Sequence, residues 1–201
     1  MQGLYGLKTW FGRLLEPVLR LAIRIRLSPD VFTLLGVLGG VAAGAGVVWL
    51  QWWLVLLGGL LRLAGANLDG GLARRRGKPT RFGAIKNEVG DRLADFATML
   101  SFAWIPAVAD DAQLQPLCYF AAGASALPSI ASWLGLVRGR ARINGGPLGK
   151  TERAFLAVIL VGLLQCGLPV SLTVSWGMLV IVIGSTLTAL LRLRSIFARP
   201  E

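Results

Sequence analysis

Long apolar runs separated by short polar stretches dominate this sequence of 201 residues. Three of the runs contain no charged residue: 31–50, 112–137 and 171–191. Each is long enough to cross the roughly 30 Å hydrocarbon core of a bilayer as a helix. Three further apolar segments are shorter or carry internal charges: 51–73, 84–109 and 154–170. The pattern predicts an all-α integral membrane protein with six transmembrane helices.

The starts of these helices and their packing faces also leave signals in the sequence. Ser28, Pro29 and Asp30 precede the first run and are typical of a turn that leads into a helix. Small residues at four-residue steps permit close contact between membrane helices. Such glycines stand at Gly36, Gly40 and Gly44 in the first run, and a pair follows at Gly58 and Gly59. We therefore expect one tight six-helix bundle over residues 29–195.

The first 28 residues differ, because apolar side chains at helical spacing alternate there with Lys and Arg. This pattern is typical of an amphipathic helix that lies in the membrane interface. A solvated basic N-terminus is the alternative. No cleavable signal peptide is expected, since basic groups persist throughout the segment. We interpret residues 1–201 as a single domain, with an interfacial helix in residues 1–28 ahead of the bundle.

Basic residues outnumber acidic ones by 21 to 10, which fits either nucleic acid or anionic lipid as a partner. Their positions favour lipid. They lie before the first span, between the second and third, between the fourth and fifth, and after the sixth, where they are Arg192, Arg194 and Arg199. The other connections contain no Lys or Arg. The positive-inside rule then places both termini on the cytoplasmic side of the inner membrane, and no nucleic acid is expected.

Few side-chain chemistries are open to this chain. Histidine is absent, which excludes His-based acid–base catalysis and His metal ligation. Cys118 and Cys166 lie inside predicted spans, and such a pair offers neither a metal-ligand spacing nor a disulfide framework. Any reaction must use carboxylates, Lys, Arg, Tyr, Ser or Thr.

Acidic residues interrupt the second and third predicted helices. Asn87, Asp91 and Asp95 are four residues apart and therefore share one stripe of a helix. Asp69 on the preceding helix is followed by Gly70, where the backbone can approach a ligand closely. An intramembrane carboxylate is unfavourable and is usually paired or functional. Because hard cations prefer oxygen ligands, the pattern predicts a divalent-metal site.

Ion pairing is the competing interpretation of the same carboxylates. Asp91 and Asp95 have basic residues within reach on the same helix and on the preceding one, namely Lys86, Arg92 and Arg62. In that case the carboxylates would stabilise the bundle and hold no metal.

The segment around these residues resembles the signature of the CDP-alcohol phosphotransferases. Their pattern reads D-x-x-D-G-x-x-A-R, eight or nine residues, then G-x-x-x-D-x-x-x-D. This chain has Asp69-Gly70-Gly71-Leu72-Ala73-Arg74, eight residues, then Gly83. The resemblance covers the whole chain, including an S-P-D-x-x-T start to the first span that ends at Thr33. The run N-E-x-x-D-R-x-x-D over residues 87–95 resembles a bacterial subgroup with a variant signature.

This resemblance implies a phospholipid-synthesising enzyme, a CDP-alcohol phosphatidyltransferase. Its reaction transfers a substituted phosphate group from a CDP-alcohol, here CDP-diacylglycerol, to a polar alcohol and releases CMP. In the family the four carboxylates of the signature hold two divalent cations, Mg²⁺ or Mn²⁺, that bind the pyrophosphate of the substrate, and homodimers are usual. The acidic residues stand near the cytoplasmic ends of the second and third spans, so the active site is expected to face the cytoplasm.

Residue roles follow from the matching signature positions. Asp69 and Asp91 would be catalytic, with Asp91 as the base that accepts the proton of the acceptor hydroxyl. The metal ligands would be Asp69, Asp91, Asn87 and Asp95, and the nucleotide-binding residues Gly70, Ala73, Arg74 and Gly83. The family's first and third aspartates are Ala66 and Asn87 here. Fewer carboxylates predict weaker cation binding, for which Glu88 and Asp95 are candidates to compensate.

The Gly-rich stretch 141–155 carries the candidate acceptor site. It brings Lys150 and Arg153 to the start of the fifth span, close in sequence to Arg142. In the resembling members that use phosphorylated acceptors such as an inositol phosphate, basic residues in a similar place hold the acceptor phosphate. We therefore favour a phosphorylated polyol as acceptor, with an ordinary basic cytoplasmic loop as the alternative.

Two other function classes fit parts of the pattern. A catalytically silent relative that binds nucleotide or lipid, or acts as a membrane scaffold, would explain the two missing aspartates. A transporter or channel would explain polar groups in a membrane, but the charges cluster at one end of two helices and do not follow a path through the bundle. Metal-dependent release of CMP separates an enzyme from both.

Overall fold

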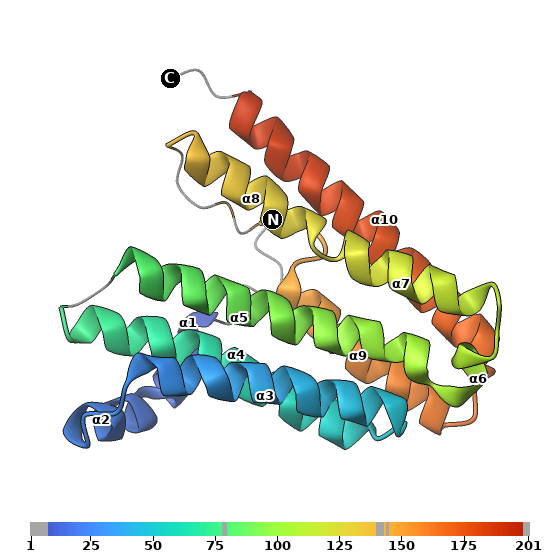
Figure 1. Ribbon diagram of the computed structural model, residues 1–201, viewed down its shortest axis with the longest axis horizontal. Helices are drawn as coiled ribbons and strands as arrows, with labels where there is room; N and C mark the ends of the chain where they lie inside the picture. Colours follow the sequence, from blue (N-terminus) through green and yellow to red (C-terminus); the bar gives the residue numbers. More distant parts are fainter. Residues whose placement is uncertain (1–7, 78–79, 140–142, 144, 199–201) are drawn as a thin grey trace.

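The computed structural model describes residues 8–77, 80–139, 143 and 145–198, and all regular secondary structure in these ranges is helical. The helices are α1 (Lys8–Leu14), α2 (Glu16–Arg24), α3 (Pro29–Val48), α4 (Trp52–Arg75), α5 (Arg81–Leu100), the 3-10 helix η2 (Ser101–Trp104), α6 (Pro106–Ala109), α7 (Leu114–Ala124), α8 (Leu127–Val137), α9 (Lys150–Gln165) and α10 (Val170–Phe197). In Figure 1, α3, α4, α5 and α9 run alongside one another, while α8 and the C-terminal half of α10 diverge from them.

Three stretches of the described chain are long and apolar enough to cross a membrane. They are α3, residues 114–137 across α7 and α8, and α10. The prediction of an all-helical membrane protein is thereby confirmed. In the described residues, α4 and α5 carry charges and α9 has only 16 residues, so these helices fall outside that group.

Local signals explain where several helices begin and end. Ser28 caps α3, its hydroxyl accepting a hydrogen bond from the backbone N–H of Asp30 at 3.3 Å. Thr80 caps α5 by accepting from the N–H of Gly83 at 3.0 Å. The expected helix over 84–109 is divided into α5, η2 and α6, and α6 starts at Pro106, which has no N–H to continue a helix. The run 112–137 is likewise divided, with Pro128 in the first turn of α8.

The N-terminal segment forms two short helices where one was expected. Pro17 lies in the first turn of α2 and has no N–H, which favours a new helix start there. Leu19 and Ala22 of α2 pack against Leu72 and other residues of α4. The Arg75 guanidinium holds both oxygens of Glu16, at 2.8 and 2.7 Å, and keeps the pKa of that carboxyl below its ordinary value. Placement of this segment in the membrane interface stays a prediction.

Glycines let α3 approach both α4 and α5 at backbone distance, as the small-residue pattern predicted. A Cβ atom on Gly40 would lie 2.4 Å from the Cα of Ala94 on α5. A Cβ on Gly58 of α4 would lie 2.5 Å from the backbone nitrogen of Ala43 and 2.6 Å from the carbonyl oxygen of Gly39. These contacts hold the two helices that carry the acidic residues against a common partner.

Gly58→Ala is therefore expected to destabilise the bundle by roughly 1–3 kcal/mol, because backbone atoms of α3 must move to admit the methyl group. The matched control is Gly59→Ala on the same helix, where a Cβ meets nothing within 4 Å. That variant should be neutral or slightly stabilised, since Ala is the better helix former. Thermal unfolding in detergent measures both. Equal midpoints for the two variants would contradict the close packing of α3 on α4.

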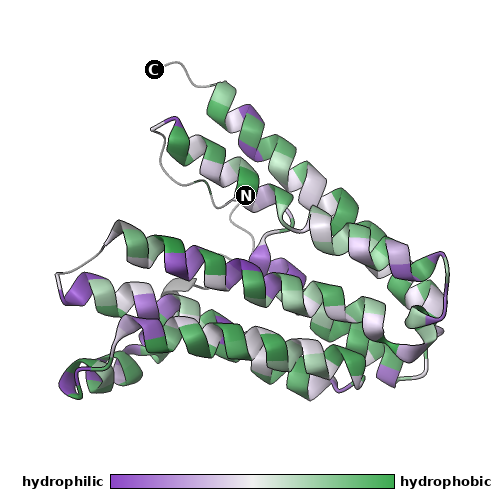
Figure 2. Ribbon diagram, viewed as in Figure 1, coloured by the Kyte–Doolittle hydropathy of each residue, from purple (hydrophilic) through white to green (hydrophobic). Residues whose placement is uncertain are grey.

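Polar residues collect in one half of the bundle. The main apolar core joins residues from α3, the end of α5, α7, α9 and α10, and includes Val47, Phe102, Val161 and Met178. Figure 2 shows hydrophilic residues on α5 and at the start of α9, whereas α3 is largely hydrophobic. The acidic residues on α4 and α5 thus face the N-terminal end of α9.

Candidate active site

Asp69 is buried on α4 with its carboxylate held from two directions. The hydroxyl of Thr33 on α3 donates to its Oδ2 at 3.0 Å, and the N–H of Gly70 donates to its Oδ1. Thr33 is the last residue of the S-P-D-x-x-T start of α3. The helix-start motif therefore also orients the aspartate of the signature.

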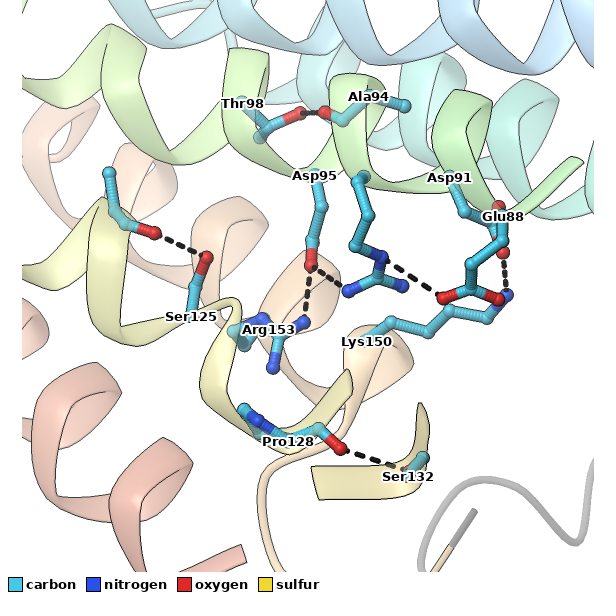
Figure 3. A network of polar contacts seen from close by, with 12 residues as sticks. Glu88, Asp91, Ala94, Asp95, Thr98, Ser125, Pro128, Ser132, Lys150 and Arg153 are labelled. Atoms are coloured by element: carbon cyan, nitrogen blue, oxygen red, sulfur yellow. Dashed lines mark hydrogen bonds and ion pairs between the residues drawn. The ribbon is translucent and has the colours of Figure 1, made fainter. Parts of the chain in front are cut away.

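Asp91 lies on α5, and its closest charged partner comes from α9. Its carboxylate is buried, and the Nζ atom of Lys150 lies 2.5 Å from its Oδ2 (Figure 3). Asp69 is close enough to interact electrostatically with both Asp91 and Lys150. Asp91 therefore lies beside the first residue of α9, and Asp69 lies outside the cavity lining that Asp91 and Lys150 share.

Asp95, one turn further along α5, lies among arginines. Arg153 of α9 donates to its Oδ2, Arg62 NH2 of α4 is 3.2 Å from its Oδ1, and Arg92 NH1 is 3.4 Å from its Oδ2. Asp95, Arg62 and Arg153 are all at most 3% exposed. Ion pairing, the competing interpretation, therefore describes the contacts of Asp95, and its role as a metal ligand stays a prediction.

A cavity of about 190 Å³ lies beside these residues, between α4, α5, α8 and the start of α9. Asn67, Gly70 and Arg74 of α4 line one side, with Asn87, Asp91 and Arg92 of α5. The facing side carries Lys150, Glu152, Arg153 and Arg192. The lining residues therefore include five basic and two acidic side chains, and the cavity suits an anion.

The structure brings most of the predicted nucleotide and acceptor residues to this cavity. Gly70, Arg74, Lys150 and Arg153 line it, whereas Ala73 and Gly83 lie outside the lining on α4 and α5. Arg142, the third predicted acceptor residue, lies outside the described residues.

Arg192 is a lining residue that the sequence interpretation placed in the basic tail after the sixth span. Helix α10 continues to Phe197, so Arg192 stands inside it and is buried. Its NH1 donates to the carbonyl oxygen of Pro128 at 2.6 Å and to the hydroxyl of Ser132 at 2.8 Å. The sequence could have shown that Arg192 lies within the helix, because no helix-breaking residue stands between the apolar run and Phe197.

A second, apolar groove of about 340 Å³ runs between α1, α4 and α9. Its walls are large hydrophobic side chains, including Trp10, Phe11, Leu60, Leu63 and Phe155. The groove and the cationic cavity share four lining residues: Ala66, Asn67, Lys150 and Thr151. A polar chamber and an apolar groove therefore meet beside Asp91.

The donors near the cavity set a limit on metal binding. Two carboxylates, Asp69 and Asp91, and the amide oxygen of Asn87 are the candidate ligands. Ala66 lines the cavity at the position of the signature's first aspartate. In the described part of the chain, no group of three or more His, Cys, Asp or Glu side chains is arranged to hold a metal ion. By donor type such a set would suit at most one hard cation completed by water and phosphate, since Mg²⁺ is usually bound by one or two carboxylates.

Known proteins are similar to this chain over most of its length. The family model described as CDP-alcohol phosphatidyltransferase matches residues 26–190. Phosphatidylinositol phosphate synthase of Mycobacterium tuberculosis (strain H37Rv) is 29% identical, over 94% of this chain and 88% of its own length. The inner membrane protein YnbA of Escherichia coli (strain K12) is 32% identical over 76% of each chain.

Solved structures of the mycobacterial synthase share the fold. The crystal structure with CDP-DAG bound has a TM-score of 0.76 at 27% identity, over 94% of this chain and 96% of that one. The structure in complex with manganese and citrate has a TM-score of 0.74 at 27% identity, over 92% and 89% of the two chains.

Proposed function

Because the chain belongs to the CDP-alcohol phosphatidyltransferase family, we propose that it transfers the phosphatidyl group of CDP-diacylglycerol to a phosphorylated polyol. The enzyme moves a substituted phosphate from a CDP-alcohol to an acceptor hydroxyl and releases CMP, with Mg²⁺ or Mn²⁺ as cofactor. We propose the identity of the donor lipid, the class of the acceptor and the roles of individual residues from the geometry of the site.

The joined cavities support a lipid-linked donor. Acyl chains fit the apolar groove between α1, α4 and α9, and the nucleotide and pyrophosphate fit the cationic cavity. Gly70 lines the cavity and would let the nucleotide lie close to α4, whereas Ala73 and Gly83 stay predicted nucleotide-binding residues outside the lining. Arg74 lines the cavity and supplies charge-assisted hydrogen bonds to phosphate. A substrate that is apolar at one end and anionic at the other matches this pair of spaces.

The proposed reaction is a displacement at the β-phosphorus of the donor. The acceptor hydroxyl oxygen forms a new bond to this phosphorus, the bond to the oxygen that bridges the two phosphorus atoms breaks, and CMP leaves with the bonding electrons. Asp91 accepts the proton of the attacking hydroxyl. Asp69, Asp91 and Asn87 would hold a divalent cation, which when bound neutralises charge on the departing phosphate. Asp95 remains a predicted ligand, but its contacts favour orienting Arg153.

The cationic wall of the cavity is the observation that carries the acceptor assignment. Arg153 and Arg192 are buried there, and Lys150 stands at its edge beside Asp91. The excess of basic over acidic side chains in the lining favours an anionic ligand. Relatives with 29% identity are named phosphatidylinositol phosphate synthases. An inositol phosphate is therefore the first acceptor to test.

The membrane arrangement is proposed from the same observations. Six crossing helices result if α4, α5 and α9 span the bilayer together with α3, the α7–α8 segment and α10, against which they pack. Both termini and the cavity then face the cytoplasm across the inner membrane, as the positive-inside rule requires. The family resemblance adds the proposal that two such chains form a homodimer.

The acceptor assignment predicts CMP release from CDP-diacylglycerol and Mn²⁺ only when a phosphorylated polyol is present. The purified protein is incubated with matched pairs of free and phosphorylated polyols, inositol and inositol phosphate first. Arg192→Met should raise the KM for the phosphorylated acceptor about 10- to 100-fold, the worth of a hydrogen bond to a charged group. Arg194→Met on the exposed face of α10 is the matched control. Equal release with free and phosphorylated polyols would contradict a phosphate subsite.

A further inference from the structure

We infer that the ammonium group of Lys150 takes the place of one of the two divalent cations that the family resemblance implies, so that the chain works with a single metal ion. The inference rests on the proposed function, in which phosphates bind the cavity beside Asp91. It concerns how this chain balances charge after losing two of the four signature carboxylates, at Ala66 and Asn87.

The charges around the cavity argue against two divalent ions. Two such ions bring four positive charges, whereas the signature positions retain only the carboxylates of Asp69 and Asp91. The lining itself already has an excess of basic over acidic side chains. A second dication would therefore enter a region that is positive before it arrives, and buried like charges repel strongly.

The ammonium group of Lys150 lies beside a signature carboxylate, at the junction of the two cavities. Its Nζ atom is 2.5 Å from Oδ2 of Asp91, and the same side chain lines both the cationic cavity and the apolar groove. The position is fixed by the fold: Lys150 is the first residue of α9, and Arg153 is anchored to Asp95 three residues further along this helix. The ammonium group is thus held between a signature carboxylate and the space for the phosphates.

An ammonium group supplies part of what a divalent cation supplies at this point. It carries a positive charge and three N–H donors, so it can hold Asp91 with one donor and phosphate oxygens with the others. Its hydrogen bonds to phosphate and carboxylate are charge-assisted. Unlike a metal ion, it stays in the site when a chelator is added.

Lys86 provides an internal comparison. It forms an ion pair with Asp30 at the same 2.5 Å separation, but the pair is more exposed and neither residue lines the cavity. A lysine whose only role is to join two helices would behave like Lys86. Lys150 differs because its carboxylate partner belongs to the signature and its ammonium group faces a ligand-sized space.

Counting bound Mn²⁺ tests the inference without relying on turnover. Purified protein in detergent is titrated with Mn²⁺ in the presence of CDP, and bound ions are quantified by electron paramagnetic resonance. Wild type should bind one Mn²⁺ per chain. Lys150→Gln should bind Mn²⁺ at least about tenfold more tightly, because a neighbouring positive charge is removed. The triple variant Ala66→Asp, Asn87→Asp, Lys150→Gln should bind two, and Lys86→Gln should match wild type.

Two Mn²⁺ per chain in the wild type would overturn the inference, as would unchanged Mn²⁺ affinity in Lys150→Gln. A wild-type count of two Mn²⁺ overturns the inference even if the variants fail to fold. CMP release in the same preparation separates this inference from the proposed function. One bound Mn²⁺ without phosphate-dependent CMP release would leave Lys150 as the second cation and reject the acceptor. Two bound Mn²⁺ together with CMP release that requires a phosphorylated polyol would reject the role of Lys150 and support the acceptor.

Discussion

Asp69→Asn is expected to lower CMP release by about a hundredfold to a thousandfold while the helical bundle stays intact, a loss typical of removing one electrostatic contact to the transition state. The amide has nearly the same shape as the carboxylate and can still accept the hydrogen bond from Thr33. What disappears is a negative charge in a site that has only two signature carboxylates left. The same reasoning applies to Asp91→Asn, which also loses the proton acceptor.

The measurement is initial CMP release at saturating Mn²⁺, with thermal unfolding as the check on folding. Asp110→Asn serves as the matched control, because Asp110 is an exposed carboxyl in the connection after α6 and far in sequence from the signature. Wild-type turnover in both Asp69→Asn and Asp91→Asn would show that the site assignment is wrong. Loss of folding in either would assign that carboxylate a structural role.

Asp95→Asn should produce the largest loss of stability, about 3–5 kcal/mol, because it leaves buried guanidinium groups without their counter-ion. The carboxylate joins α5 to Arg62 of α4 and Arg153 of α9, and all three side chains are at most 3% exposed. The neutral amide keeps the volume but not the charge. Both the packing of α9 and the direction of Arg153 depend on this contact.

Unfolding midpoints in detergent measure the effect, and a double-mutant cycle assigns it. Adding Arg62→Met to Asp95→Asn should recover part of the lost stability, since one unpaired buried cation is then removed. Asp30→Asn, which breaks the exposed pair with Lys86, is the control and should remain close to wild type. A midpoint for Asp95→Asn equal to that of Asp30→Asn would mean that the buried network contributes nothing to stability.

The two departures from the signature, at Ala66 and Asn87, leave two signature carboxylates in place. Ala66 and Asn87 raised the alternative of a silent relative, because carboxylates that hold metal are missing. The chain nevertheless keeps Asp69 and Asp91 close enough to interact, with a basic residue beside them. A site with fewer negative charges and its own cation remains consistent with the family's reaction.

Local features of the sequence were sufficient for the apolar helical segments and for the signature residues, but not for the breaks that divide the segments 84–109 and 112–137. Apolar runs predict membrane helices because a backbone in lipid must satisfy its own hydrogen bonds. Ser28 and Thr80 cap α3 and α5 through residues only two and three positions away. Asp69 and Asp91 were found because the motif's spacing is local to α4 and α5. The glycine pattern likewise predicted which face of α3 packs closely.

Local sequence patterns could not predict the contacts between helices that are distant in the sequence. Nothing in the periodicity of α5 indicates that Asp91 pairs with Lys150, 59 residues away, or that Asp95 faces Arg153. The burial of Arg192 beside Pro128 depends on how α10 packs on α8. Such pairings are decided by the packing of helices against one another, since side-chain spacing fixes a face of a helix but not the helix that covers it. Local sequence patterns are therefore enough for the apolar helical segments and the chemistry of the signature, whereas the packing of the helices settles which charges meet.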